Sequence, residues 1–390
     1  MIDYSRYQNI LDNHYNDVLR LISNGNPDSF FLQMLSEKQK KLFDCIVNNV
    51  ENQKSVLSVL ITSILKKIAD PNQDIRLHRE EFKDGYSGRS LDTKVVTPWL
   101  KQNYTKFAPK ESGWLTRSIE QPHPFDKNFP GKIRNKKVKK AFLEILYYIE
   151  NNNYDPAICL KYIIFLLEKE KSNHINIINE IENVTYRGEV TINFLINLFR
   201  KHFALKNSSR LPVIAMYSIY QCIFQKIDLY KSKCLMPLNP HTAADRHIGY
   251  GDIEIYDINN APYEIVEIKH NIPIDKNMII DVLNKIKETS IKRYYILTTA
   301  EPNFLERDKD EIFKLTDYIK NKLKIEIIPN GVLPTLKYYM RFIENPLEVI
   351  TLYIQNVKSE FKSGTDVRKE HIQYLHELIA EFNINKKANI

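Results

Sequence analysis

Hydrophobic residues recur with a helical period along most of the first half of the chain. This period predicts amphipathic helices over residues 4–24, 36–49, 53–69, 140–151, 156–171 and 190–205. Residues 210–233 are apolar around most of the helix circumference, as expected for a helix packed against a sheet. The first half is therefore predicted to be a largely helical region.

The pattern changes after residue 250, where short apolar runs replace the helical period. Strands are predicted over residues 252–256, 263–270, 293–299 and 324–328. Helices are predicted over residues 278–287, 308–323, 333–357 and 367–382. The order helix, strand, strand, helix, strand, helix, strand predicts an α/β (α+β) layer with a mixed β-sheet flanked by helices.

The helical period disappears between residues 75 and 135, where glycine, proline and serine recur. The 390 residues carry a net charge of +8. Residues 81–140 hold 14 Lys+Arg and 6 Asp+Glu, so this segment alone accounts for +8. Both tryptophans, Trp99 and Trp114, lie in it as well. Basic residues interleaved with aromatic ones indicate a nucleic-acid contact surface over about 75–140.

Arginine and glutamine can read base edges, whereas lysine and serine mostly contact phosphates. The candidate DNA contacts in this segment are Tyr86, Arg89, Ser90, Lys94, Trp114, Arg117 and Gln121. The alternative is an irregular solvated surface whose tryptophans fill the scaffold beneath it. In that case the segment would have no part in binding.

No apolar run is long enough to span a bilayer, and the N-terminus lacks a signal-peptide pattern. The expected location is therefore the cytoplasm. The cysteines, Cys45, Cys159, Cys222 and Cys234, are scattered and show no zinc-ligand spacing. We expect them to be buried free thiols in a reducing compartment.

The candidate chemistry lies in the two predicted strands after residue 250. Residues two apart in a strand share a face, so Glu267 and Lys269 project together. If the two strands pair as a hairpin, Asp252 is carried close to Glu267. Carboxylate oxygens are the ligands that Mg²⁺ prefers, and the backbone carbonyl of Ile268 could add a third oxygen. Lys269 could orient an attacking water or stabilise the developing charge.

Other polar residues nearby receive weaker predictions. Glu254 shares a face with Asp252 and could support the site, and His270 could take a minor part. Glu264 lies on the opposite face and is expected to be solvated, while Asp257 is expected to serve the turn. For His241, Asp245 and Arg246 we expect ordinary loop contacts.

The motif Asp252, fourteen residues, then Glu267–Ile268–Lys269 resembles the metal-dependent nuclease signature Asp…(Asp/Glu)-x-Lys. The order of elements around it resembles the restriction-endonuclease fold. Gly251 stands where the strictest form of the motif has proline. Residues 245–274, 294–299, 85–90 and 97–99 resemble type II restriction endonucleases of the PD-(D/E)xK superfamily in particular.

The resemblance implies a Mg²⁺-dependent, sequence-specific endonuclease that hydrolyses double-stranded DNA. It also implies a homodimer and a cognate DNA methyltransferase that protects the host. The predicted organisation is a helical region over 1–206, a nuclease core over 207–332 and C-terminal helices over 333–390. Two alternatives stay open: a structure-specific repair or recombination nuclease, and a non-catalytic DNA-binding protein.

Overall fold

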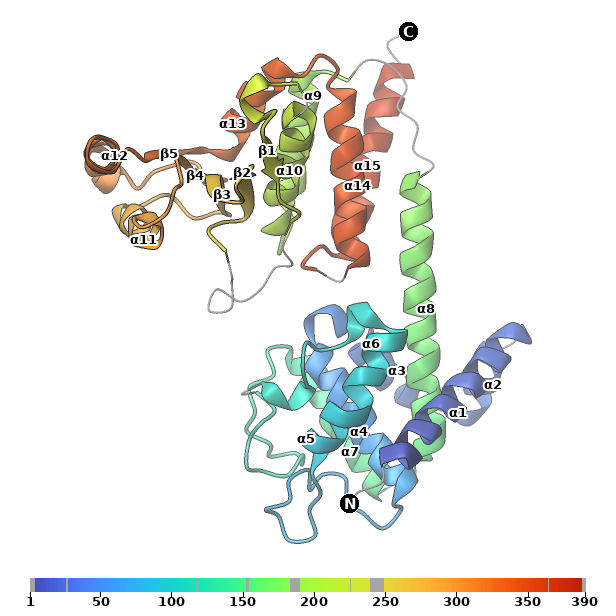
Figure 1. Cartoon of the computed structure of the whole chain (residues 1–390). Helices are drawn as coiled ribbons and strands as arrows, with labels where there is room; N and C mark the ends of the chain where they lie inside the picture. Colours follow the sequence, from blue (N-terminus) through green and yellow to red (C-terminus); the bar gives the residue numbers. More distant parts are fainter. Residues whose placement is uncertain are drawn as a thin grey trace. The chain divides into compact units, whose positions relative to one another are not determined.

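The computed structural model describes residues 4–25, 27–116, 118–151, 154–182, 190–224, 226–238, 249–363 and 365–387. The chain divides into two compact units, unit 1 (Met1–Asn176) and unit 2 (Ile177–Ile390). Each unit has its own hydrophobic core. Figure 1 shows the elements of both units, coloured along the sequence. Among the described helices, none is both long and apolar enough to cross a membrane.

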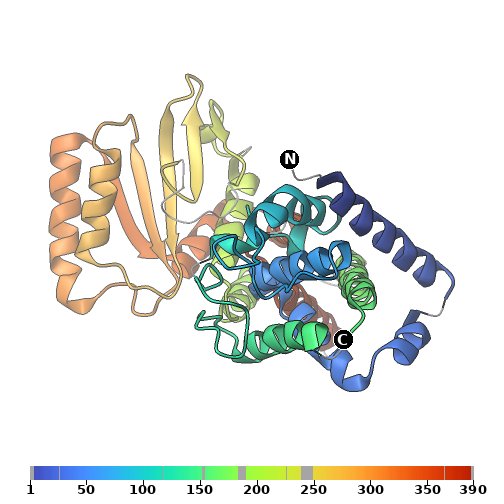
Figure 2. The ribbon, with the colours of Figure 1, turned by 90° about the horizontal axis from the view of Figure 1, so that it is seen from below.

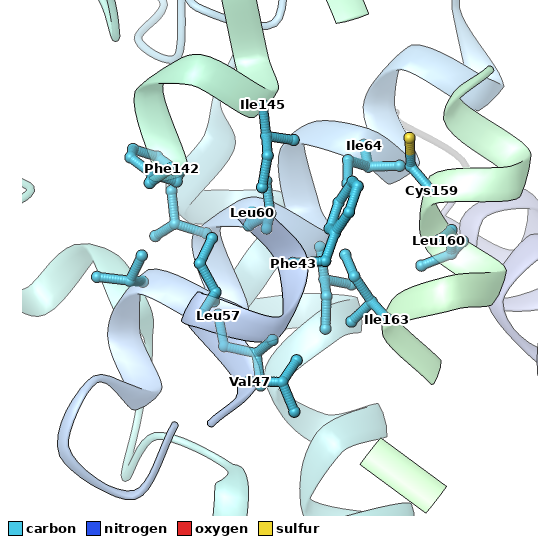
Figure 3. Packing of buried hydrophobic residues seen from close by; sticks show 14 of the residues in the cluster. Phe43, Val47, Leu57, Leu60, Ile64, Phe142, Ile145, Cys159, Leu160 and Ile163 are labelled. Atoms are coloured by element: carbon cyan, nitrogen blue, oxygen red, sulfur yellow. The ribbon is translucent and has the colours of Figure 1, made fainter. Parts of the chain in front are cut away.

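Unit 1 is built from helices and short helical turns. Its α-helices are α1 (Tyr4–Ser23), α2 (Pro27–Met34), α3 (Glu37–Val47), α4 (Lys54–Ala69), α5 (Gly88–Leu91), α6 (Thr97–Asn103), α7 (Lys136–Asn151) and α8 (Pro156–Glu182), the last of which continues past Asn176 into unit 2. Every residue from Val56 to Leu65 is buried, because α4 is covered on all sides. Figure 3 shows Leu57, Leu60 and Ile64 of α4 among side chains of α3, α7 and α8.

The segment between α4 and α7 folds onto α4 through buried polar contacts. Asp92 is fully buried at the start of a π-helical turn, Asp92–Val96. Its carboxylate accepts hydrogen bonds from the hydroxyls of Ser58 and Ser112 and from the amide of Gly113, the last at 2.7 Å. A buried carboxylate is tolerated only when donors surround it in this way. The segment is therefore an ordered covering of the core despite its lack of sequence periodicity.

Unit 2 contains a five-stranded mixed sheet in the order β1-β2-β3-β4-β5. The strands are β1 (Lys233–Leu235), β2 (Ile253–Asp257), β3 (Pro262–Lys269), β4 (Arg293–Thr298) and β5 (Glu326–Gly331). Strands β1, β2 and β3 pair antiparallel, and β3, β4 and β5 pair parallel. The mixed α/β architecture predicted from the sequence is confirmed.

Helices cover both faces of this sheet. The helices are α9 (Ile192–Phe203), α10 (Arg210–Phe224), α11 (Lys276–Ile286), α12 (Lys309–Leu323), α13 (Val332–Tyr339), α14 (Leu347–Lys362) and α15 (Lys369–Lys387). Figure 2 shows α11 and α12 on one side of the strands and α10 on the other. Ile265 and Ile296 belong to the core that contains α11 and α12, whereas Val266 and Ile268 belong to the core that contains α10. Helices α9 and α13–α15 share this second core, so unit 2 extends beyond residues 207–332 on both sides.

Several boundaries differ from the sequence-based prediction. The helix predicted over 333–357 is two helices, α13 and α14, and the helix predicted over 156–171 continues to Glu182 in α8. Two further differences concern the sheet. Helix α10 ends at Phe224, not at residue 233, and residues 233–235 form the edge strand β1 against β2. A strand of three residues is too short to show a period. Strand β5 continues through Pro329, which pairs with Ile296 of β4. Proline lacks a donor but is tolerated there because β5 is an edge strand.

The four cysteines are all free thiols, as predicted. Cys159 and Cys222 are buried and Cys45 is half-buried. The prediction of burial was wrong for Cys234, which is exposed because it lies on the edge strand β1.

Candidate active site

The hairpin of β2 and β3 brings the predicted acids together. Ile253 pairs with Val266 across the hairpin, and Asp252 directly precedes this pair. The amide of Asp252 donates to the carbonyl of Val266 at 2.9 Å, one residue away from the register of the ladder, so the pairing ends in an irregularity at Asp252. The Asp252 carboxylate accepts the amide of Ile268 at 2.7 Å and is repelled by the charge of Glu267. The two carboxylates are therefore neighbours across the hairpin.

Lys269 joins this pair from the same face of β3. Its Nζ lies 2.7 Å from Oε1 of Glu267. The side chains of Lys269 and Glu267 are 34% and 22% exposed, respectively. The structure thus brings Asp252, Glu267 and Lys269 together where solvent and a substrate can reach them.

The surroundings of the Asp252 carboxylate disfavour its negatively charged form. Burial, followed by repulsion from Glu267, raises the pKa of Asp252 to about 6. The amide of Ile268 donates to Oδ2 of Asp252 at 2.7 Å, and Arg210 and Lys269 also act in the lowering direction, but these effects are smaller. Two carboxylates held close together with incomplete compensation favour the binding of a cation.

The oxygen donors at this position suit a magnesium ion. The N–H and C=O groups of one strand residue point to the same side, so the carbonyl of Ile268 faces the same edge as the amide that Asp252 accepts. Two carboxylates and a carbonyl are hard oxygen ligands, and Mg²⁺ keeps several waters of its own. Within the described residues there is no group of three or more His, Cys, Asp or Glu side chains placed to hold a metal. The set at this site has two such side chains, and the backbone supplies the third donor.

Gly251 and Glu254 shape the turn before Asp252. A Cβ atom on Gly251 would lie 2.5 Å from Cγ2 of Ile265 and 2.8 Å from the carbonyl oxygen of Val266, so no side chain fits there. Glu254 is buried, and its carboxylate accepts the amides of Tyr250 and Gly251 at 2.5 and 3.2 Å. Glu254 therefore supports the site by fixing the backbone that presents Asp252.

His270 connects the end of β3 to two neighbouring elements. Its Nε2 lies 3.1 Å from the hydroxyl of Ser208, just before α10, and its Nδ1 lies 2.9 Å from the hydroxyl of Thr299, just after β4. Burial lowers the pKa of His270. A neutral imidazole can donate to one hydroxyl and accept from the other. His270 therefore holds the end of β3, next to Lys269, against Ser208 and Thr299.

Glu264 was expected to be solvated, and this prediction was wrong. It is fully buried on the α10 side of β3. Its Oε1 accepts the hydroxyls of Tyr220 and Tyr230 at 2.8 and 3.0 Å, and Arg293 lies 3.7 Å from its Oε2. Burial raises the pKa of Glu264. Alternation along the strand predicted the opposite face correctly, but it could not show that α10 covers that face.

Three other predictions concern loop residues. Asp257 serves the turn as predicted, since its Oδ1 accepts the amides of Asn259 and Ala261 at 2.9 and 3.0 Å. His241, Asp245 and Arg246 lie outside the described residues. Sequence reasoning missed Arg210, whose charge acts on Asp252 and which pairs with Glu360 at 2.7 Å. An arginine opening an otherwise apolar helix was the available signal.

The DNA-contact candidates of unit 1 divide into buried and exposed residues. Tyr86 and Trp114 are buried; the Tyr86 hydroxyl donates to Ser63 at 3.3 Å, and the Trp114 indole donates to His78 at 3.0 Å. They belong to the core, as the alternative interpretation of this segment held, and are not available for contact.

Four of the remaining candidates, Arg89, Ser90, Lys94 and Gln121, are exposed or half-buried in unit 1. Lys94 is exposed, and Arg89 is exposed with an ion pair to Glu120 at 3.0 Å. Ser90 and Gln121 are half-buried, and Arg117 lies outside the described residues. Part of the predicted surface therefore has accessible polar groups.

We compared the sequence with protein-family models and with curated proteins. No protein-family model matches the chain, and no curated protein shows significant similarity to it. Its function is therefore inferred from the geometry of the site and from the motif that the site contains.

Proposed function

We propose that the chain is a Mg²⁺-dependent, sequence-specific endonuclease of the type II restriction kind, which hydrolyses phosphodiesters of double-stranded DNA. The observation that carries this proposal is the meeting of Asp252, Glu267 and Lys269 on one face of the β2–β3 hairpin. A mixed sheet with helices on both faces surrounds them, which is compatible with a restriction-endonuclease-like core.

Each residue of the site has a role in this reaction. Asp252, Glu267 and the carbonyl of Ile268 would hold Mg²⁺, which, when bound, neutralises phosphate charge and makes a water more acidic. The Lys269 ammonium, 2.7 Å from Glu267, orients the attacking water or stabilises the charge that develops on the phosphate. Glu254 and His270 keep the two strand ends in place.

Cutting both strands of a duplex requires two such sites, so we propose that the chain acts as a homodimer on a symmetric target. A cognate methyltransferase would then protect the host DNA. Unit 2 would hydrolyse the phosphodiester, and the basic surface of unit 1 would contact the DNA.

Digestion of a plasmid of known sequence tests the proposal. Discrete fragments that appear with Mg²⁺ and disappear with chelator would support it, and sequencing the fragment ends would give the target. A random smear would favour the structure-specific nuclease. Absence of cutting together with DNA binding would favour the non-catalytic alternative.

A matched pair of lysine variants sharpens this test. We expect Lys269→Ala to lower the cleavage rate by ~10²–10³-fold, the typical effect of removing one preorganised charge-stabilising group, while DNA binding persists. Lys292→Ala, an exposed lysine just before β4, should cut at the wild-type rate. Equal rates for Lys269→Ala and the wild type would refute the assignment of Lys269.

A further inference from the structure

Four lysines line one depression on the surface of unit 1. They are Lys127, Lys136, Lys139 and Lys140, and the depression has a volume of about 340 Å³. Lys127, Lys136 and Lys140 are exposed, and Lys139 is half-buried. The depression lies far along the chain from the β2–β3 hairpin, and the site described above uses none of its residues.

Helix α7 provides one wall of the depression. Lys136, Lys140, Leu143 and Tyr147 recur at helical spacing and share one face of α7. Lys127, in the loop before α7, places its Nζ 4.5 Å from the centre of the Tyr147 ring. The result is an apolar floor of Leu143 and Tyr147 with ammonium groups around it.

The charge of this depression is poorly compensated. Glu144 is the one acid in its lining, and it lies 3.8 Å from Lys140, so the lining carries four positive charges and one negative charge. Lys136 and Lys140 are four apart on the helix, a spacing at which like charges repel. The first turn of α7 contains no acidic residue, although acids are the residues that the helix dipole favours there.

Two basic residues elsewhere in unit 1 are examples of direct pairing with an acid. Arg89 pairs with Glu120 at 3.0 Å, and Lys67 pairs with Glu150 at 2.9 Å. The lysines of the depression are thus set apart by concentrated positive charge around an apolar floor. A bound anion with an apolar part would relieve the repulsion and cover the floor.

We propose that this depression binds the sugar–phosphate backbone of double-stranded DNA, independently of its sequence. A phosphate can accept hydrogen bonds from several ammonium groups at once, and the carbon edge of a deoxyribose can lie against Leu143 and Tyr147. Such contacts fix the position of the protein on the duplex without reading bases. The proposal rests on the proposed function in taking DNA as the substrate, but it concerns binding and not cleavage.

The salt dependence of DNA binding tests the proposal. The probe is a labelled DNA duplex of arbitrary sequence, titrated at several salt concentrations in chelator so that no cleavage occurs. The test variant carries Lys127→Gln, Lys136→Gln and Lys140→Gln. The control variant removes three exposed lysines of unit 1 that lie outside residues 75–140, through Lys38→Gln, Lys41→Gln and Lys169→Gln.

Each lost phosphate contact reduces the slope of log K against log [salt] by about 0.9. The test variant should therefore have a slope smaller by about 2–3. Between about 50 and about 200 mM salt, the wild-type chain should lose roughly 40-fold more affinity than this variant does. The control variant should keep the wild-type slope. Thermal unfolding of the test variant should be unchanged or shifted upwards, because the substitutions remove like-charge repulsion.

Three results would overturn the proposal: no DNA binding by the wild-type chain, an unchanged slope in the test variant, or an equal loss of slope in both variants. Its failure differs from failure of the proposed function. Cleavage with Mg²⁺ and an unchanged slope would remove only the backbone site. A reduced slope without any cleavage would support the backbone site and remove only the enzyme.

Discussion

Strand β3 carries two glutamates, three residues apart, that the fold treats in opposite ways. Glu264 is fully buried beneath α10, where two tyrosine hydroxyls donate to it. Glu267 is partly exposed on the other face, next to Lys269 and close enough to Asp252 to raise the pKa of that carboxyl. The comparison teaches that the residue type alone does not make an acid functional. Oε1 of Glu264 accepts two tyrosine hydroxyls inside the core, and its Oε2 lies 3.7 Å from Arg293, whereas Glu267 lies next to Lys269 and Asp252 where a ligand can reach it.

The largest expected effect separates the two glutamates by activity. We expect Glu267→Gln to lower the rate of Mg²⁺-dependent DNA cleavage by at least ~10²-fold, because it removes a charged group from the reacting site. Glu264→Gln should cut at the wild-type rate, since that side chain lies on the other face of the sheet. Initial rates on a plasmid substrate measure both. Equal losses in the two variants would break the comparison.

The next effect separates them by stability. Glu264→Ala leaves the hydroxyls of Tyr220 and Tyr230 buried without their acceptor, at a cost of about 1–3 kcal/mol for each group. We therefore expect the free energy of unfolding to fall by ~2–6 kcal/mol, as measured by urea titration. Glu264→Gln keeps an acceptor oxygen and should lose less. A cost below ~1 kcal/mol for Glu264→Ala would show that the tyrosine contacts contribute little.

Substitution of Asp252 should change the free energy of unfolding by less than Glu264→Ala does, and in the opposite direction. Its pKa is raised to about 6 in the folded chain from an ordinary value of 3.8, so the folded state binds the proton more tightly than the unfolded state. This group therefore destabilises the fold as pH rises between these two values, by ~1–3 kcal/mol above pH 6. Asp252→Asn should remove this loss, so that the variant is more stable than the wild type at pH 7 while its cleavage is impaired.

Urea unfolding at pH 4 and pH 7, each with and without Mg²⁺, measures this effect. At pH 7, Mg²⁺ should stabilise the wild type, because an ion that binds only the folded state shifts the equilibrium towards it. It should stabilise Asp252→Asn less. Glu288→Gln, at an exposed position after α11, is the control and should behave like the wild type. If Asp252→Asn were less stable than the wild type at pH 7, Asp252 would be a structural residue like Glu264.

The sequence predicted the parts of the site that depend on local geometry. Alternation along a strand put Glu267 and Lys269 on one face, and the predicted hairpin carried Asp252 close to Glu267. It could not show what covers each face, because that depends on packing between elements distant in sequence. Glu264 was misjudged because α10 lies over it, and Tyr86 and Trp114 because their segment folds onto α4. The three-residue strand β1 was missed because its pairing with β2 is also tertiary.

The smallest effect concerns how the functional face is held in place. His270 follows Lys269 and contacts the hydroxyls of Ser208 and Thr299 at 3.1 and 2.9 Å. We expect His270→Ala to lower the cleavage rate by ~10-fold, the lower end of the effect of removing a group that orients metal ligands, with the KM for DNA unchanged. His270→Asn can keep one of the two contacts and should recover part of the rate.

A variant of Thr299 shows whether His270 positions the site or only stabilises the fold. If His270 acts by fixing the end of β3, Thr299→Val should lower the rate on its own, and it should add little to His270→Ala because both changes break the same tie. Independent, additive losses would mean that His270 and Thr299 act separately. An unchanged rate in His270→Ala, with only a lower free energy of unfolding, would make His270 a stabilising residue. Asp252, Glu267 and Lys269 would then be the only groups left in the proposed catalytic role, and the contrast with Glu264 would rest on Glu267 alone.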